Sequence, residues 1–315
     1  MLKRFLLFLN LILVISLRGF SQGNLAIDAR VLRNDGTHIY LWGEEINYKY
    51  DMQAGSIYIQ LLNQSPQGER DDFRLGEAWF SLNFYDEKVF VKVGRIPLPF
   101  GLNAIYDPHF EVIQPLYQQS LGLRLDEGAC VSGSYGSYKY FLSASRGLKK
   151  ERKEGKTTYI LRVERKIPPN PFIKGDFGFS LLSGNLPLVT EEGLSNKYIN
   201  KTRIGLDFKV PIGRSLLLGE AHIGGDKDIN VGGFFLLFEI PWNERTKFIL
   251  SWRSFNFDLD KKKEVSMGGG GLSWEIDAHN RLSLIYQRDL YNKKDIYTLQ
   301  WLIKYNFNDI AKLRF

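Results

Sequence analysis

Charged side chains at alternating positions of this chain could act on ions that move past them. We consider four basic residues together, because each lies among apolar neighbours in a run of alternating character: Lys92, Arg124, Lys139 and Arg162. Two acidic residues, Asp107 and Glu111, lie in a proline-rich connection. Rings of Lys and Arg favour anions, and opposed rows of both signs order water and pass small polar solutes. The alternative for each residue is a place in a solvated network of ion pairs with no special role.

Catalytic and metal-binding patterns are absent from the sequence. The four histidines are scattered without the spacing of metal ligands, and neither G-x-S-x-G nor H-E-x-x-H occurs. Residues 226–230 begin like a calcium-binding loop, but Val231 occupies the glycine position and Leu237 the last acidic position. We therefore expect no enzyme activity, no metal site and no cofactor.

The first 21 residues have the three parts of a secretory signal peptide. Lys3 and Arg4 precede an apolar run over residues 5–17, and Gly19-Phe20-Ser21 is a small-residue cleavage site. The alternative is a retained membrane anchor, but the run is short for a membrane-spanning helix, which needs about 20 residues. We expect cleavage after Ser21 and export of residues 22–315 as one domain.

Charge and cysteine content exclude two further classes of protein. The formal net charge is +7; three basic residues leave with the signal peptide, so that 39 basic and 35 acidic residues remain, a net charge of +4. So mild a charge does not indicate nucleic-acid binding. Cys130 is the only cysteine, which excludes a small fold held together by disulfides.

Most of residues 22–315 alternate apolar and polar residues with a period of two, which predicts β-strands with one apolar face. The last stretch, residues 297–315, shows the pattern with large side chains and ends on Leu313 and Phe315. Asn308 and Asp309 interrupt it, either as a bulge or as a strand boundary. The alternation is ambiguous at residues 216–223, and we expect a polar loop at residues 182–200. The total is about sixteen strands.

Two features favour a membrane barrel over a secreted β-sandwich. Tight turns alternate with connections that are mostly longer and polar, as in outer-membrane barrels. Large aromatic residues lie near strand ends, where interfacial girdles require them; they are Trp242, Trp252, Trp274, Trp301, Tyr85, Tyr138 and Tyr305. We predict an all-β fold, a closed antiparallel transmembrane β-barrel that contacts the lipid bilayer. Loop lysines could pair with lipopolysaccharide, attract anions or be solvated.

The export signal, the all-strand body and the terminal Phe315 resemble Gram-negative outer-membrane porins over the whole of residues 22–315. One short motif, GRIPLPFGL at residues 94–102, is similar to a segment of the phosphate-selective porin O/P group. The resemblance implies that the long loop after strand 5, residues 96–120, folds into the lumen. Arg95 belongs to the constriction by this motif, but strict alternation from Val93 points it outward, so a bulge at Gly94 is needed. The implied constriction comprises Lys92, Arg95, Asp107, Glu111, Arg124, Lys139 and Arg162.

The resemblance also implies a function. The barrel would lie in the outer membrane of a Gram-negative bacterium and let small hydrophilic solutes and ions diffuse passively, with a mild preference for anions. Leu313 and Phe315 would form the terminal signal for the barrel assembly machinery. A homotrimer is compatible with the pattern, since lipid-facing and subunit-facing apolar residues look alike. The alternative is a structural, adhesive or assembly role without an open channel.

Overall fold

The computed structural model describes residues 22–33, 37–52, 54–64, 74–85, 88–106, 111–146, 157–167, 175–190, 193–261 and 263–306. The expected signal peptide lies outside these ranges, and so do Asp107, the interruption at Asn308 and Asp309, and the terminal Leu313 and Phe315. What the sequence suggests for them therefore stays a prediction.

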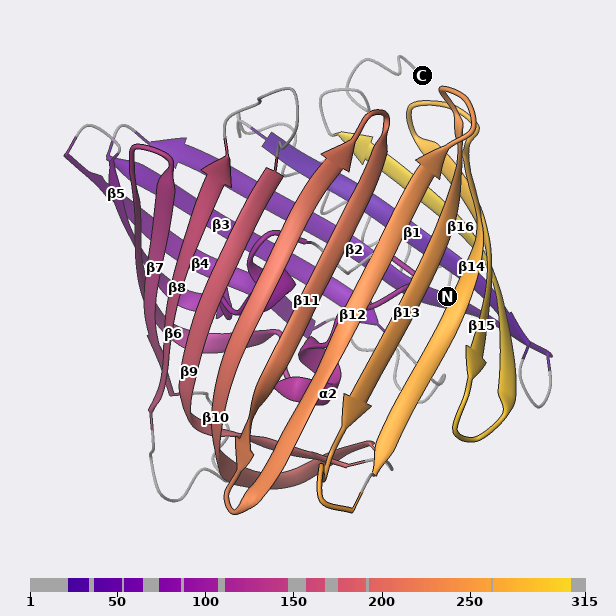
Figure 1. Ribbon diagram of the computed structural model, residues 1–315. Coiled ribbons are helices and arrows are strands. Elements are labelled where there is room, and N and C mark those ends of the chain that lie inside the picture. Colours follow the sequence, from indigo (N-terminus) through magenta and orange to yellow (C-terminus); the bar gives the residue numbers. More distant parts are fainter. Residues whose placement is uncertain are drawn as a thin grey trace, which may run out of the picture.

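Sixteen strands within the described ranges form one closed barrel, in which β1 pairs with β16 (Figure 1). The strands are β1 (Gln22–Arg33), β2 (Thr37–Met52), β3 (Gly55–Gln64), β4 (Arg74–Phe84), β5 (Val89–Pro97), β6 (Leu125–Tyr135), β7 (Tyr138–Ser145), β8 (Thr158–Ile167), β9 (Gly175–Thr190), β10 (Gly193–Ile212), β11 (Ser215–Asp226), β12 (Ile229–Pro241), β13 (Thr246–Asn256), β14 (Glu264–Glu275), β15 (Asn280–Asp289) and β16 (Lys294–Asn306). Every neighbouring pair is antiparallel, which confirms the predicted fold class and strand count. Within the described ranges, no helix has the length and apolar character to span a membrane.

Strand β8 shows how the sequence builds this wall. Its residues alternate between buried and exposed along most of the strand. Leu161 is 42% exposed on the outside, and the next residue, Arg162, is completely buried on the inside. Because successive side chains of a strand point to opposite faces, one face of β8 is apolar and the other carries charge.

The described parts of the connection between β5 and β6, residues 98–106 and 111–124, lie within the ring of strands (Figure 1). We call residues 98–123 the inner segment; it contains two short helices, η1 (Gly101–Ala104) and α2 (Tyr117–Ser120). Helix η1 contacts β9, β10 and β11, and α2 contacts β9. The two helices therefore rest on one side of the barrel.

The long hairpin of β9 and β10 extends beyond its neighbours. Strand β8 pairs with β9 only as far as Ser183, whereas the pairing of β9 with β10 continues to Thr190 and Gly193. The expectation of a polar loop at residues 182–200 is wrong, because apolar side chains in this stretch pack inward. Leu186 is fully buried against the inner segment, and an added Cβ at Gly122 would meet Val189. The hairpin tip thus covers the inner segment.

Candidate functional site

Apolar side chains hold the inner segment against the wall of the barrel. The first cluster joins the segment to β8 and β9, and it consists of Leu98, Phe100, Leu121, Ile160, Leu182 and Leu186. The second joins it to β11, β12, β13 and β15, and it consists of Leu102, Ile113, Leu116, Leu218, Val231, Phe235, Leu237, Ile249, Phe255 and Ile285. Full burial of one such side chain contributes about 1.5–3 kcal/mol. This part of the inner wall is therefore apolar, unlike the polar lumen that the alternation suggests elsewhere.

A glycine in the wall makes room for one of these side chains. Gly205 on β10 lies between Ser180 on β9 and His222 on β11 in the strand register. A Cβ at this glycine would lie 2.9 Å from Cζ of Phe100. The ring of Phe100 also packs edge-on against His222, with 4.9 Å between the ring centroids. Glycine inside a strand often marks the close approach of another part of the chain, and here it forms the recess that receives the segment.

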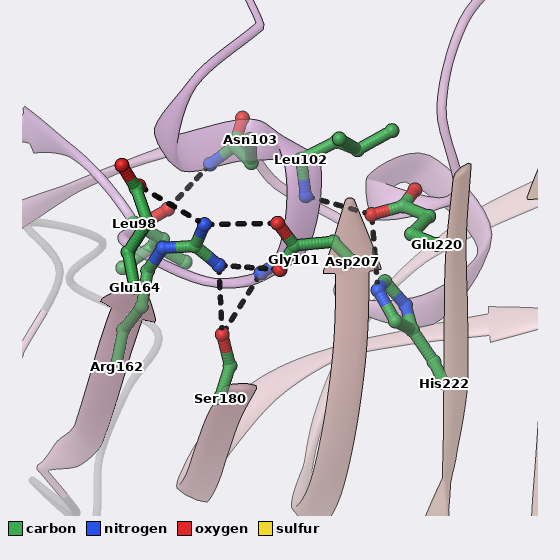
Figure 2. Close-up of polar contacts among 10 residues, drawn as sticks. All are labelled: Leu98, Gly101, Leu102, Asn103, Arg162, Glu164, Ser180, Asp207, Glu220 and His222. Carbon is green, nitrogen blue, oxygen red and sulfur yellow. Dashed lines mark hydrogen bonds and ion pairs between the residues drawn. The ribbon is translucent and has the colours of Figure 1, made fainter. Parts of the chain in front are cut away.

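A buried ion pair lies beside this recess (Figure 2). Arg162 donates from Nη2 to Oδ1 of Asp207 at 2.9 Å, and more weakly to Oε2 of Glu164 at 3.4 Å. The hydroxyl of Ser180 accepts from Nη1 of Arg162 at 3.2 Å and from the backbone N–H of Gly101 at 3.2 Å. Ser180 therefore links the ion pair of the wall to the inner segment.

The residue opposite Asp207 on the neighbouring strand β11 is also acidic, and it also contacts the inner segment. Glu220 on β11 accepts hydrogen bonds from the backbone N–H groups of Leu102 at 2.9 Å and Leu116 at 2.6 Å. Its Oε2 also lies 3.1 Å from Nε2 of His222 (Figure 2). Hydrogen bonds to an ionised acceptor are roughly twice as strong as neutral ones, so this carboxylate is a strong attachment point.

Basic residues of β10 hold the end of α2. Lys201 donates to the carbonyl oxygen of Ser120 at 3.2 Å, and Arg203 donates to the same oxygen at 3.1 Å and to the Ser120 hydroxyl at 3.2 Å. Both residues also form ion pairs with Asp226. Asp226 thus pairs with two basic side chains of the barrel wall. Among the described residues, no group of three or more His, Cys, Asp or Glu is arranged to hold a metal ion.

Two more arginines hold the middle of the segment. Arg253 on β13 donates to the carbonyl oxygen of Gln114 at 3.0 Å. Arg281 on β15 forms an ion pair with Glu111 at 3.0 Å. Glu111 therefore faces an arginine of β15, and not the four basic residues that we grouped with it from the sequence.

The predicted constriction residues fall into separate groups. In the first, Lys92 lies over the indole ring of Trp79, with Nζ 4.0 Å from the ring centroid. The indole N–H of Trp79 donates to Glu77 at 3.3 Å, and Glu77 forms an ion pair with Arg124 at 3.0 Å. The ring of Tyr58 stacks on that of Trp79, with 5.2 Å between the ring centroids. Lys92 and Arg124 are thus joined through residues of β4.

The second group is centred on Glu164. Lys139, which is half exposed, and Arg162, which is fully buried, both form ion pairs with this carboxylate, at 3.5 and 3.4 Å. Arg162 is enclosed by the wall, so its side chain holds the structure together and offers no surface to a passing solute. Its expected place at the surface of a constriction is not what the structure shows.

Arg95 does not point inward. The register of β5 with β4 and with β6 is continuous on both sides of Gly94, so the expected bulge is absent. Arg95 pairs with Ala78 and lies on the same face as Val93, which is 52% exposed on the outside. Its guanidinium forms an ion pair with Glu127 at 3.3 Å. The positive φ of Gly94 (133°) twists the strand locally without changing the alternation of its side chains.

Several residues of the site were not selected from the sequence. Glu220 and His222 lie in residues 216–223, where apolar residues at both alternations made the register ambiguous. Two polar residues spaced two apart in such a run share one face of a strand. Their spacing alone indicates that Glu220 and His222 point to the same side. For the contacts of Ser120 and Gln114 there was no signal, because they depend on the path of the inner segment.

The fold is that of the outer-membrane porins. No protein-family model and no curated protein matches the chain, but several solved structures share its fold. The loop L8 deletion mutant of OmpT, an outer membrane protein of Vibrio cholerae, has a TM-score of 0.67 at 8% identity, over 90% of this chain and 98% of that one. OprB of Pseudomonas putida has a TM-score of 0.65 at 9% identity, over 93% of this chain and 95% of that one. An anion-selective porin from Comamonas acidovorans has a TM-score of 0.64 at 11% identity, over 91% of this chain and 100% of that one. The resemblance to the phosphate-selective group stays a prediction.

Proposed function

We propose that this chain is a porin of a Gram-negative outer membrane, through which small hydrophilic solutes and ions diffuse passively. The observation that carries this proposal is the one-sided attachment of the inner segment. Its two helices contact β9, β10 and β11, and its apolar clusters involve β8, β9, β11, β12, β13 and β15. The passage then runs between the segment and the opposite wall, formed by β1 to β5.

The opposite wall carries side chains suited to a passage for water and ions. Many of its inward positions are charged or polar, beside the buried apolar Ala26, Leu62 and Ile96; the polar ones include Asp28, Arg30, Glu45, Lys49, Gln60, Ser81 and Lys92. Most of its charges are paired, as Lys49 is with Asp51 at 2.8 Å. Among the described residues, Lys92 has no carboxylate within ion-pair distance and lies instead over Trp79. This favours a mild preference for anions.

The outer surface supports a place in the membrane. Large aromatic side chains are exposed there: Trp242 and Trp274 lie at the ends of β12 and β14, where interfacial residues of membrane barrels gather, and Trp252 and Trp301 lie further inside β13 and β16. We extend the proposal to contact with lipid and lipopolysaccharide, to export by the signal peptide, and to assembly through Leu313 and Phe315. One structure of Vibrio cholerae OmpT is described as a trimer form, and a homotrimer is part of the proposal for this chain.

Conductance in planar bilayers tests the proposed function. We expect steady single-channel conductance from refolded protein, and a larger conductance when residues 101–120 are replaced by a short Gly-Ser linker. Heat-modifiable gel mobility shows that each sample is folded as a barrel. Folded protein that never conducts would overturn the proposal in favour of a barrel without a channel. The reversal potential in a salt gradient decides the charge preference, and a shift that favours cations would contradict the preference for anions.

A further inference from the structure

One carboxylate of the barrel wall holds the inner segment at two points. The two N–H groups bonded to Glu220 belong to Leu102, in η1, and Leu116, which immediately precedes α2. Glu220 comes from β11, 118 residues beyond Leu102 and 104 residues beyond Leu116, and its side chain is almost completely buried. Between described residues, Arg253 contacts the segment at Gln114 and Arg281 contacts it at Glu111. Glu220 ties two parts of the segment to each other as well as to the wall.

We propose that Glu220 is the positioning residue that sets the shape of the inner segment, and with it the width and steadiness of the passage. This inference rests on the proposed porin function. The carboxylate has two oxygens, and each takes one N–H group: Oε2 that of Leu102 and Oε1 that of Leu116. No neutral side chain of the same shape can accept at both places, because an amide has only one acceptor oxygen.

Two neighbouring residues fix the carboxylate in this position. His222 approaches Oε2 at 3.1 Å from the next inward position of the same strand. Gly101 lies directly over both side chains, and a Cβ there would be 2.5 Å from Oε2 of Glu220 and 2.7 Å from Nε2 of His222. The backbone φ of Gly101 is +56°, a conformation that favours glycine. Position 101 thus requires glycine for two independent reasons, and both serve the contact with Glu220.

Hydrogen exchange of the folded barrel tests the attachment directly. In Glu220→Gln, one N–H group loses its acceptor, and in Glu220→Ala both do. We expect the amides of Leu102 and Leu116 to exchange at least about tenfold faster in Glu220→Ala, given the strength of hydrogen bonds to charged groups. Amides in β3 and β14 should exchange as in the wild type. Unchanged exchange at Leu102 and Leu116 would overturn the proposal, whether or not the protein conducts.

Single-channel recording then tests the effect on the passage. We expect Glu220→Gln and Glu220→Ala to show frequent current fluctuations and a more variable conductance than the wild type. Glu164→Gln is the matched control, because it also removes one inward carboxylate but has no bond to the inner segment among the described contacts. If the current through Glu164→Gln fluctuates as much as that through Glu220→Gln, the effect comes from the lost charge and the proposal is wrong. A wild type that never conducts overturns the porin function instead.

A variant without any change of charge gives an independent test. The Cβ added in Gly101→Ala should displace Glu220 and His222, so the current through this variant should fluctuate as it does in Glu220→Ala. Because both changes break the same contact, their combination should be no worse than the stronger single variant. Gly136→Ala is a suitable control, since this glycine also has a positive φ (57°) but an added Cβ meets no atom within 4 Å. Steady channels in Gly101→Ala would contradict the proposal.

Discussion

Arg162 and Asp207 meet across a strand that separates them, because the residue between them is a glycine. The guanidinium comes from β8 and the carboxylate from β10, and Gly178 of β9 lies between them. A Cβ at Gly178 would lie 2.5 Å from both Nη2 of Arg162 and Oδ2 of Asp207. Both charged side chains are buried, so the wall carries an ion pair that neither water nor solute reaches.

The pair should matter strongly for stability. Removing one partner of a buried ion pair costs about 3–5 kcal/mol, and without Asp207 the buried Arg162 keeps only its longer contact with Glu164 at 3.4 Å. We expect Asp207→Asn to lower the free energy of unfolding by that order, measured by urea titration of the barrel in lipid vesicles. Lys139→Ala, which removes the half-exposed partner of Glu164, should cost about 1 kcal/mol or less. Equal losses in the two variants would contradict the assignment of Arg162 to a buried pair.

Adding a methyl group at Gly178 should have a similar consequence without removing a charge. The Cβ of Gly178→Ala would force the guanidinium and the carboxylate apart, and crowding of this kind costs about 1–3 kcal/mol. In the double variant Gly178→Ala/Asp207→Asn, the losses should not add, because the methyl group then disturbs a pair that is already broken. Additive losses in the same urea titration would show that the glycine serves another purpose.

Phe100 should be a main apolar anchor of the inner segment. It is almost completely buried, and Phe→Ala substitutions in well-packed sites cost about 3–5 kcal/mol. Because the barrel closes without the segment, we expect Phe100→Ala to release the segment locally and to leave the strands intact. Limited proteolysis should then cut residues 98–123 faster, while gel mobility of the folded barrel stays unchanged. Loss of the folded form altogether would mean that the segment is needed for closure.

Lys92 should affect ion selectivity, and Arg95 should not. Lys92 points inward from β5, whereas Arg95 points outward. We expect Lys92→Glu to shift the reversal potential in a salt gradient toward cations, because it reverses a charge beside the passage. Arg95→Gln should leave the reversal potential unchanged within error. A shift of comparable size in Arg95→Gln would restore the inward position that the sequence motif suggests.

The turn between β14 and β15 should give one acid-sensitive contribution to stability. Asp277 accepts from the backbone N–H of His279 at 2.7 Å and from both N–H groups of Asn280, which lowers the pKa of its carboxyl. Because the pKa is lower in the folded state, the carboxylate stabilises the fold at pH values above the ordinary Asp pKa of about 3.9. This stabilisation is lost as the pH falls through the pKa of Asp277 in the folded protein. The difference in melting temperature between wild type and Asp277→Asn should therefore be larger at pH 7 than at pH 3.

The strands could be predicted from the sequence because barrel walls have two different sides. In β8, the apolar Tyr159, Leu161 and Val163 alternate with inward residues that include Arg162 and Glu164, so the fold class and the inward position of Arg162 both followed from alternation. Alternation disappears where both sides of a strand are apolar. Phe234 faces outward and Phe235 faces inward against the inner segment, and a continuous apolar run indicates a strand buried on both faces. Such a run in a barrel wall indicates that something apolar lies inside.

The site was harder to predict, because its contacts join residues that are distant in the sequence. Nothing local distinguishes Glu220 from any other inward acid until the path of the inner segment is known. Arg95 was misplaced for a different reason, since a short motif was given more weight than the alternation from Val93, and the alternation was right. Physical periodicity was therefore the better guide within a strand, and neither source gave the partners of the inner segment.

The attachment of the inner segment also constrains the order of assembly. The segment is made early in the chain, but its partners come late: Leu102 needs Glu220, 118 residues further on, and Glu111 needs Arg281, 170 residues further on. Contacts of such long range form slowly. A chain emerging from its N-terminus must therefore keep part of this apolar segment without its partners on β11 to β15 until most of the wall has been made.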